Sequence, residues 1–190
     1  MKKHISILAI AISGMAFSQV IIGDQTGTVP AGQKQSVLME FAQGQNKGII
    51  LPYVRTKPSG TGFVEGTIIL DATSPDKARV KYYNGIISTE APDGWVDLSN
   101  GHDADITATM SSQPTVTEDP AAKVIVGEEA STAKGVLVLE SDNKAMVLPM
   151  VESTDDVPDP APGMMVYINK TGAKRLAVYN GDGWTYWKPQ

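Results

Sequence analysis

The sequence contains no cysteine and only two histidines among its 190 residues. The absence of cysteine excludes a disulfide-stapled scaffold, a thiolate metal site and a cysteine nucleophile. Acidic residues outnumber basic ones by 21 to 16, which argues against a basic nucleic-acid-binding protein. A sustained helical period is missing too. What remains is a chain with 42% hydrophobic residues, too many for a wholly disordered protein.

The first 18 residues predict a secretory leader. Lys2 and Lys3 supply its positive end, residues 5–17 form a mostly apolar run, and Ala16-Phe17-Ser18 fits the small-x-small cleavage pattern, which would leave Gln19 at the new N-terminus. The run is short for a membrane span, which needs about 20 residues. We therefore expect no stable membrane span after leader removal, with a retained anchor as the alternative. The expected location is extracellular or at the outer cell surface, or else the periplasm.

Internal repetition is the strongest pattern in the rest of the chain. Six blocks recur in one order, with an offset that falls from 104 residues at Val20 and Val124 to 89 residues at Trp95 and Trp184. The recurring pairs are Val20–Asp24 with Val124–Glu128, Val37–Phe41 with Val136–Glu140, Lys47–Val54 with Lys144–Val151, Gly66–Leu70 with Gly163–Tyr167, Tyr83–Gly85 with Tyr179–Gly181, and Trp95 with Trp184. Two copies are too few for a stacked array of small repeats.

The repeat predicts four segments: a signal peptide at residues 1–18, one module at 19–98, a linker at 99–123 and a second module at 124–190. The linker is rich in Ser, Thr, Asp, Ala and Pro, although Ile106 and Met110 could pack locally.

Short apolar runs separated by Gly, Pro, Asn and Asp predict an all-β fold, in which two related modules of short antiparallel strands and hairpins are joined by an extended linker. The strands expected in the second module are Val124–Val126, Val136–Leu139, Met146–Met150, Met164–Ile168, Leu176–Tyr179 and Trp184–Trp187. Hairpins are expected at Asn169–Ala173 and at Asn180–Gly183, because Asn-Gly and Asp-Gly favour positive φ. Short helices near Thr154–Val157 or in the linker stay open.

Several of these runs do not alternate between apolar and polar residues. Val136–Leu139 and Met164–Ile168 are apolar on both strand faces, and Ile49–Leu51 nearly so. A module of about 60–80 residues has too little chain to bury both faces of several strands. We therefore expect the other module, another subunit or another protein to cover one face, since an exposed face of this kind would promote aggregation.

The second module carries a recognisable pattern at Val147–Val151, Val157–Tyr167, Leu176–Gly181 and Trp184. The pattern resembles a duplicated β-rich module of exported surface proteins of Bacteroidetes-type bacteria, and it is similar to segments of phage tail-fibre-like proteins. The resemblance implies a structural or adhesive protein that is commonly fibrous and often trimeric. After Leu-Pro, where the family usually has Arg, this chain has Tyr53 in one copy and Met150 in the other.

Residues with catalytic or metal-binding chemistry are sparse. The one histidine after the leader, His102, lies near Asp103 and Asp105, and a second acidic group comprises Asp155, Asp156 and Asp159. The first is better explained as a polar loop and the second as a solvated turn between prolines, because neither has a recognised ligand spacing. We predict no enzymatic activity, no cofactor and no metal site.

The aromatic side chains are the candidate binding residues, for a protein interface or a glycan: Trp187, Trp184, Tyr186, Tyr179 and Trp95. Trp184, Tyr186 and Tyr179 could instead form a hairpin core on one strand face, whereas Trp187 lies on the other face. The expected function is an exported non-enzymatic structural or adhesive protein that acts through assembly, with itself as a homo-oligomer such as a trimer or with another surface protein. The alternative is a carbohydrate-binding module that uses the C-terminal aromatics.

Overall fold

The computed structural model describes residues 19–25, 27, 29–59, 64–114, 117, 119 and 121–187. The predicted leader lies outside these residues. Within residues 19–98 the elements are β1 Val20–Ile22, η1 Ala31–Ser36, β2 Val37–Phe41, β3 Ile49–Ile50, β4 Tyr53–Val54, β5 Ile68–Asp71, η2 Pro75–Lys77, β6 Arg79–Tyr83 and β7 Trp95–Asp97. After α2 Thr107–Ser112 they are β8 Val124–Val126, β9 Leu137–Leu139, β10 Ala145–Val147, β11 Met150–Val151, η3 Thr154–Asp156, β12 Met164–Ile168, β13 Arg175–Tyr179 and β14 Trp184–Trp187.

The all-β prediction is confirmed, since short strands form the sheets and the helices are brief. Antiparallel pairing joins β5, β6 and β7, and equally β12, β13 and β14. The expected hairpins at Asn169–Ala173 and Asn180–Gly183 make the connections in the second set, with Gly172 and Gly181 at positive φ. The short helices left open by the sequence occur as α2 and η3.

One predicted strand is interrupted. The sequence predicts a continuous strand over Met146–Met150, but the structure has β10, then Leu148 and Pro149, then β11. Proline has no N–H to donate to a ladder, so the run breaks there. The run that contains Leu51 and Pro52 breaks in the same way between β3 and β4.

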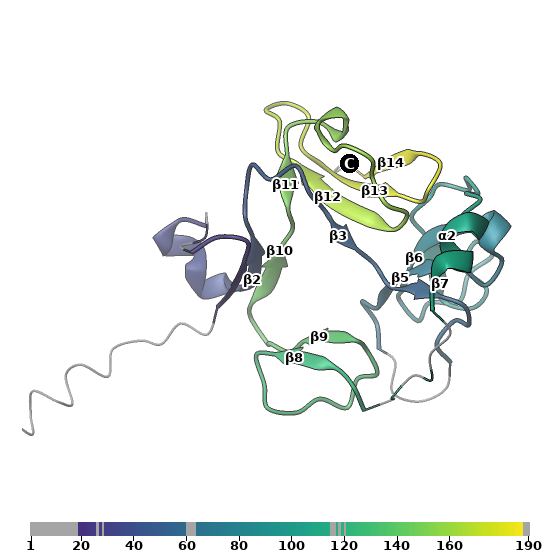
Figure 1. The fold of residues 1–190 in the computed structure, drawn as a ribbon. Coiled ribbons are helices and arrows are strands. Elements are labelled where there is room, and N and C mark those ends of the chain that lie inside the picture. The colour runs from purple at the N-terminus through teal and green to yellow at the C-terminus, as the bar shows by residue number, and fades with distance from the viewer. Residues whose placement is uncertain are drawn as a thin grey trace, which may run out of the picture.

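Parallel pairing accounts for the other half of the ladders. β1 pairs in parallel with β2, β4 with β5, β8 with β9 and β11 with β12, and each pair is joined by a connection long enough to cross over. Two ladders join strands from the first and second halves of the chain: β2 pairs in parallel with β10, and β3 pairs antiparallel with β12. Figure 1 shows the four sheets arranged around the molecule, with β8 and β9 at the bottom and the β11–β14 sheet at the top.

The largest buried cluster is built from both halves of the chain. Leu70 and Val80 from the β4–β7 sheet share this cluster with Met165 and Val178 from the C-terminal sheet. Ile106 and Met110 are buried in it as well, so the part of the predicted linker around α2 contributes to the core. The two halves therefore stabilise each other through one packed interior.

The two faces of β12 have different cover. Met165 lies in the large cluster with residues of the first half, whereas Val166 and Ile168 lie in a second cluster with Val157. Of the three covers expected for one face of Met164–Ile168, namely the other module, another subunit or another protein, the first half of the same chain supplies it here. Burial on both sides explains why the strand does not alternate.

Candidate assembly surface

The least covered apolar surface of a strand pair lies on β8 and β9. Val124, Val136 and Leu137 are 58%, 56% and 44% exposed, and we call these three residues the apolar patch. Val124 and Leu137 are register partners, so their side chains lie on the same face of the pair. Further along this face, Val126 and Leu139 pack against Leu38 and Met39 of β2. Val124 and Leu137 of the apolar patch therefore continue this packed interface out into solvent, whereas Val136, one residue before β9, lies on the opposite face.

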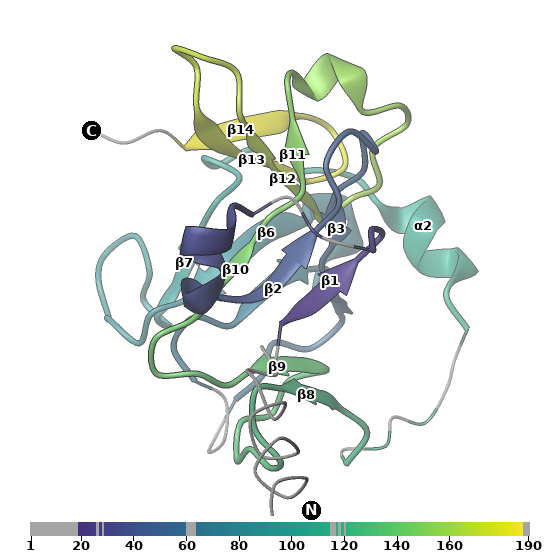
Figure 2. The same cartoon turned by 90° about the vertical axis from the view of Figure 1, so that its left-hand side faces the viewer.

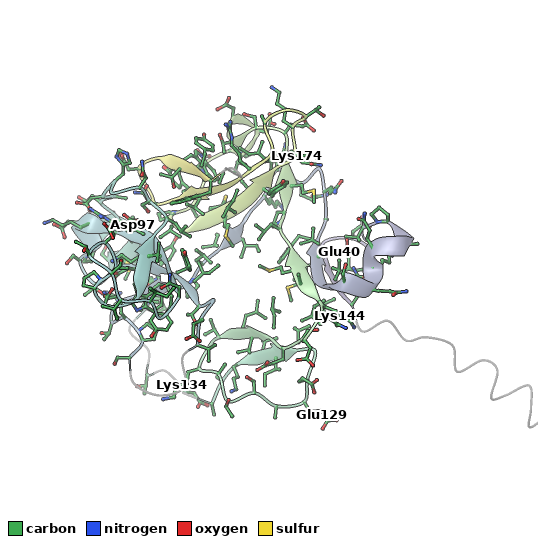
Figure 3. All side chains as sticks on the ribbon, turned by 180° about the vertical axis from the view of Figure 1, so that it is seen from behind. Glu40, Asp97, Glu129, Lys134, Lys144 and Lys174 are labelled. Carbon is green, nitrogen blue, oxygen red and sulfur yellow. The ribbon has the colours of Figure 1, made fainter. Side chains whose placement is uncertain are left out.

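The part of the apolar patch that belongs to residues 135–139 contains no charged residue. Residues 135–139 are Gly-Val-Leu-Val-Leu, without a charge. Figure 3 shows Glu129 and Lys134 at the outer rim of the β8–β9 sheet, on the side away from the rest of the molecule. Natural proteins usually protect a bare strand edge with charges, proline, a bulge or a covering element. An uncharged apolar edge of this kind is suited to an interface.

The C-terminal aromatic side chains are fixed by local contacts. The rings of Tyr179 and Trp184 lie 5.3 Å apart at their centroids, tilted by 46°. The Tyr186 hydroxyl is 3.0 Å from Thr154 Oγ1, and the Arg175 guanidinium lies 4.6 Å above the Tyr186 ring. The predicted cross-strand contact between Tyr179 and Trp184 is confirmed.

Trp187 connects the last strand to the first half of the chain. Its indole Nε1 donates to the Leu98 carbonyl oxygen at 3.0 Å, and Thr185 Oγ1 donates to the same oxygen at 2.6 Å. Trp95 lies elsewhere: it is buried, with its ring 5.4 Å from that of Tyr83. The five aromatic candidates thus do not form one cluster. Sequence reasoning identified Val136–Leu139 as needing cover but gave no sign that Val124 would be exposed beside it.

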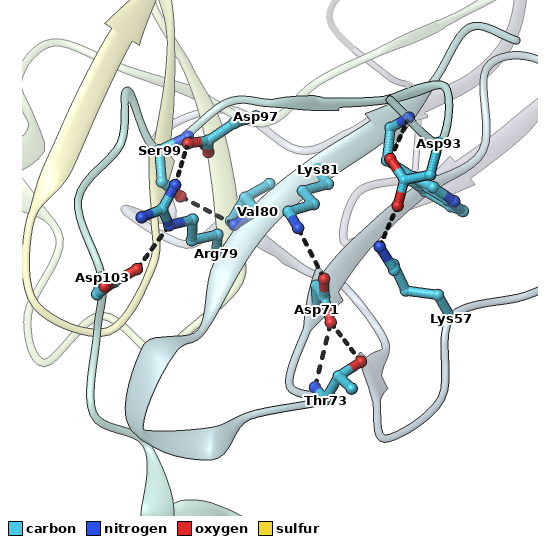
Figure 4. A network of polar contacts seen from close by, with 11 residues as sticks. Lys57, Asp71, Thr73, Arg79, Val80, Lys81, Asp93, Asp97, Ser99 and Asp103 are labelled. Atoms are coloured by element: carbon cyan, nitrogen blue, oxygen red, sulfur yellow. Dashed lines mark hydrogen bonds and ion pairs between the residues drawn. The ribbon is translucent and has the colours of Figure 1, made fainter. Parts of the chain in front are cut away.

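A polar network occupies the outer edge of the β4–β7 sheet (Figure 4). Arg79 bonds Asp103 at 2.6 Å and Asp97 at 3.1 Å, and Lys81 bonds Asp71 at 2.8 Å. A shallow polar pocket lies among these side chains, and Lys77, Thr73 and Ser74 complete its lining. Because Arg79 and Lys81 of β6 bond Asp71 of β5, Asp97 of β7 and Asp103, the network ties neighbouring strands together.

The two acidic groups considered from the sequence also have local partners. Asp105 accepts from the Thr107 N–H at the start of α2, and Ser153 and Asp156 cap η3 reciprocally. Hydrogen bonds from the Thr107 side chain and backbone lower the pKa of Asp105. In the described part of the chain, no group of three or more His, Cys, Asp or Glu residues is arranged to hold a metal ion. Within the same residues, no helix has both the length and the apolar character needed to cross a membrane.

Asp71 gives this network a pH dependence. Burial raises the pKa of its carboxyl, but hydrogen bonds from Lys81 and from the Thr73 side chain and N–H, together with the Lys81 charge, lower the pKa more, to below its ordinary value of 3.8. A carboxylate with a lowered folded-state pKa stabilises the fold above its unfolded pKa and loses that contribution as the pH falls through the folded value.

We expect Asp71→Asn to reduce the free energy of unfolding by about 1–3 kcal/mol at pH 7, because a charged hydrogen bond is lost. The difference from the wild-type protein should begin to shrink below about pH 4, where the carboxyl of the unfolded chain takes up a proton, and should disappear as the pH falls through the lower pKa of the folded state. Urea unfolding at pH 7 and pH 3 measures both values. Asp142→Asn, which removes an exposed acid after β9, is the matched control and should change little at either pH. An Asp71→Asn deficit of equal size at both pH values would contradict the assignment.

Comparison with known protein families finds a similarity in the second half of the chain. Residues 125–189, about a third of the sequence, match the family described as "Phage tail like trimerisation region". This agrees with the tail-fibre-like part of the resemblance. No curated protein and no solved structure matches the chain. The matched region begins within β8, includes Val136 and Leu137 of the apolar patch, and runs through β14.

Proposed function

We propose that this chain is an exported, non-enzymatic structural protein, built from two copies of one β module, that acts by assembling with copies of itself into a trimer at the cell surface. The assembly is carried by one observation: the apolar patch extends into the region that matches a trimerisation family. Apolar surface that stays in water costs about 25 cal/mol per Å², so its burial between chains favours association. A role in adhesion would follow from presentation of the outer loops by such an assembly.

The module duplication is supported by matching ladders. Parallel β1–β2 and β4–β5 correspond to parallel β8–β9 and β11–β12, and the β5–β6–β7 meander corresponds to β12–β13–β14. Single backbone bonds correspond as well: Leu70 N–H donates to the Pro52 carbonyl at 3.0 Å, and Tyr167 N–H donates to the Pro149 carbonyl at 2.9 Å. The tilted ring pairs Tyr83–Trp95 and Tyr179–Trp184 occupy the same register positions.

Size-exclusion chromatography with light scattering tests the assembly. We expect a particle of three chain masses that persists on dilution, because a structural interface should bury a large apolar area. The full chain, leader included, has a mass of 20.2 kDa. A particle of one chain mass at every concentration would overturn the proposed function, whereas a stable dimer would retain self-assembly and reject the trimer.

The glycan-binding alternative rests on Tyr186 and Trp187, which are 45% and 40% exposed. Both already have partners, since Arg175 lies over the Tyr186 ring and the Trp187 N–H donates to Leu98. A sugar would have to stack on the remaining ring faces, without the indole donor. We therefore favour assembly as the primary function.

A further inference from the structure

The two halves of the chain differ in which of their strand edges are paired. β2 of the first half has its second edge paired by β10 of the second half. β9 corresponds to β2 in the repeat, yet among the described strands it pairs only with β8. β3 corresponds to β10, and among the same strands it pairs only with β12. The edge of β2 that β10 pairs within the chain therefore has an unpaired equivalent in the second half, the outer edge of β9.

The ladders align these strands one residue differently from the sequence blocks. By the sequence blocks, Met39 is equivalent to Val138. In the structure, however, Val20 of β1 lies opposite Met39, and the equivalent residue Val124 of β8 lies opposite Leu137. By the ladders, Met39 is therefore equivalent to Leu137. The terminal bonds agree, because Ala42 N–H donates to Ile22 and Glu140 N–H donates to Val126 at the same 2.9 Å. Because this run is apolar on both faces, its hydrophobic pattern does not reveal a one-residue shift of the strand register.

The open edges of β9 and β3 have complementary backbone groups. Successive residues of a strand direct their N–H and C=O groups to opposite sides. Glu140 N–H and the Val136 carbonyl bond β8, so Leu137 directs its groups to the open side of β9. Leu51 N–H bonds Gly163 beside β12, so the N–H of Ile50 faces the open side of β3. Ile50 is also 54% exposed.

We propose that β9 of one chain pairs in parallel with β3 of a second copy, in the register that β2 and β10 adopt within one chain. The observed partners Met39–Met146 and Glu40–Val147 then translate to Leu137 opposite Ile49 and Val138 opposite Ile50. In this register the Ile50 N–H donates to the Leu137 carbonyl, and the Leu137 N–H donates to the Gly48 carbonyl. The pairing covers the uncharged edge beside the apolar patch and rests on the proposed self-assembly.

The geometry favours a second copy over the same chain or a foreign partner. β3 is tied to β12 and β9 to β8, and the two strands lie apart in both views of the fold (Figures 1 and 2). A contact between two different edges of identical chains is heterologous, and such contacts close into rings when the rotation fits. Three copies joined in this way use every β9 and every β3 once.

Disulfide trapping tests the register directly, because the natural chain has no cysteine. Ile49→Cys and Leu137→Cys are prepared as separate single variants, mixed and oxidised. Because disulfides require Cα atoms about 4.4–6.8 Å apart, we expect a two-chain species roughly ten-fold more abundant than from Ile50→Cys mixed with Leu137→Cys. In the control mixture, the two side chains lie on opposite faces of the proposed sheet. Light scattering of each mixture before oxidation reports assembly independently.

Three outcomes would overturn the pairing. Equal trapping in both mixtures rejects the register. Absence of trapping in mixtures that still scatter as oligomers rejects β9–β3 contact while the proposed function stands. Trapping within single molecules of Ile49→Cys/Leu137→Cys, without trapping between the separate variants, shows that the strands meet in one chain. Wild-type protein that scatters as a monomer at every concentration in the same experiment rejects the proposed function itself.

Discussion

Gly127→Ala is expected to reduce the free energy of unfolding by about 2–5 kcal/mol, from backbone strain and overpacking of similar size. Gly127 follows β8 with φ at +107°, a conformation that L side chains rarely adopt. A Cβ at this position would also overlap the Glu140 carbonyl oxygen and lie 3.2 Å from Leu38 Cδ1. Relief of that overlap requires β9 to move away from β8 and from β2. Urea denaturation followed by circular dichroism measures the loss.

Two other glycines separate strain from overlap. Gly44→Ala places a side chain at φ +71° with no atom within 4 Å, so it should cost only about 1–2 kcal/mol of left-handed strain. Gly183→Ala has neither positive φ nor a close neighbour and should be nearly neutral. If Gly127→Ala lowered the free energy of unfolding no more than Gly44→Ala does, the overlap with Glu140 would be relieved without cost at the β8–β9 junction.

Leu70→Ala is expected to cost about 2–5 kcal/mol, the range for deletion of a fully buried leucine side chain. Leu70 has no exposed surface, and its strand β5 is paired with both β4 and β6. A Cβ added at Gly163, before β12, would lie 3.3 Å from Leu70 Cβ, which shows how closely the two halves meet there. The cavity should therefore weaken both halves in one cooperative transition, measured by urea unfolding and amide hydrogen exchange.

Ile87→Ala is the matched control because Ile87 is 68% exposed. Its effect should stay within about 0.5 kcal/mol, as is usual for surface substitutions. If Leu70→Ala destabilised β4–β7 but left amide protection in β12 and β13 unchanged, the two halves would be independent domains, contrary to the shared cluster.

Much of the fold follows from local sequence chemistry. Val124–Val126, Met164–Ile168 and Trp184–Trp187 have the predicted bounds, because β-branched and aromatic residues lie between strong turn residues. The contact between Tyr179 and Trp184 follows from strand periodicity across a tight Asn-Gly turn. The lack of alternation in Met164–Ile168 also indicated that another module, subunit or protein would cover one face, without indicating which of them.

The local hydrophobic pattern did not predict which strands distant in the sequence pair with each other. The parallel ladders and the β2–β10 contact depend on where crossover connections return, which local hydrophobicity does not specify. Glu40 shows the same limit, because it is fully buried in a strand where charge predicts exposure. Its carboxylate accepts bonds from Gln19 Nε2 at 2.8 Å and from Val29 N–H at 3.0 Å, partners that only the folded loop supplies.

The β2–β10 ladder also places a demand on biosynthesis. Met39 and Met146, which are partners in this ladder, are roughly 100 residues apart in the chain. At a translation rate of about 5–20 residues per second, β10 leaves the ribosome roughly 5–20 s after β2. During that interval Leu38 and Met39 have no strand to complete their sheet, although both are buried in the finished fold. The sheet of the first half therefore cannot be completed until most of the second half has been synthesised, so its final packing is a late step of folding.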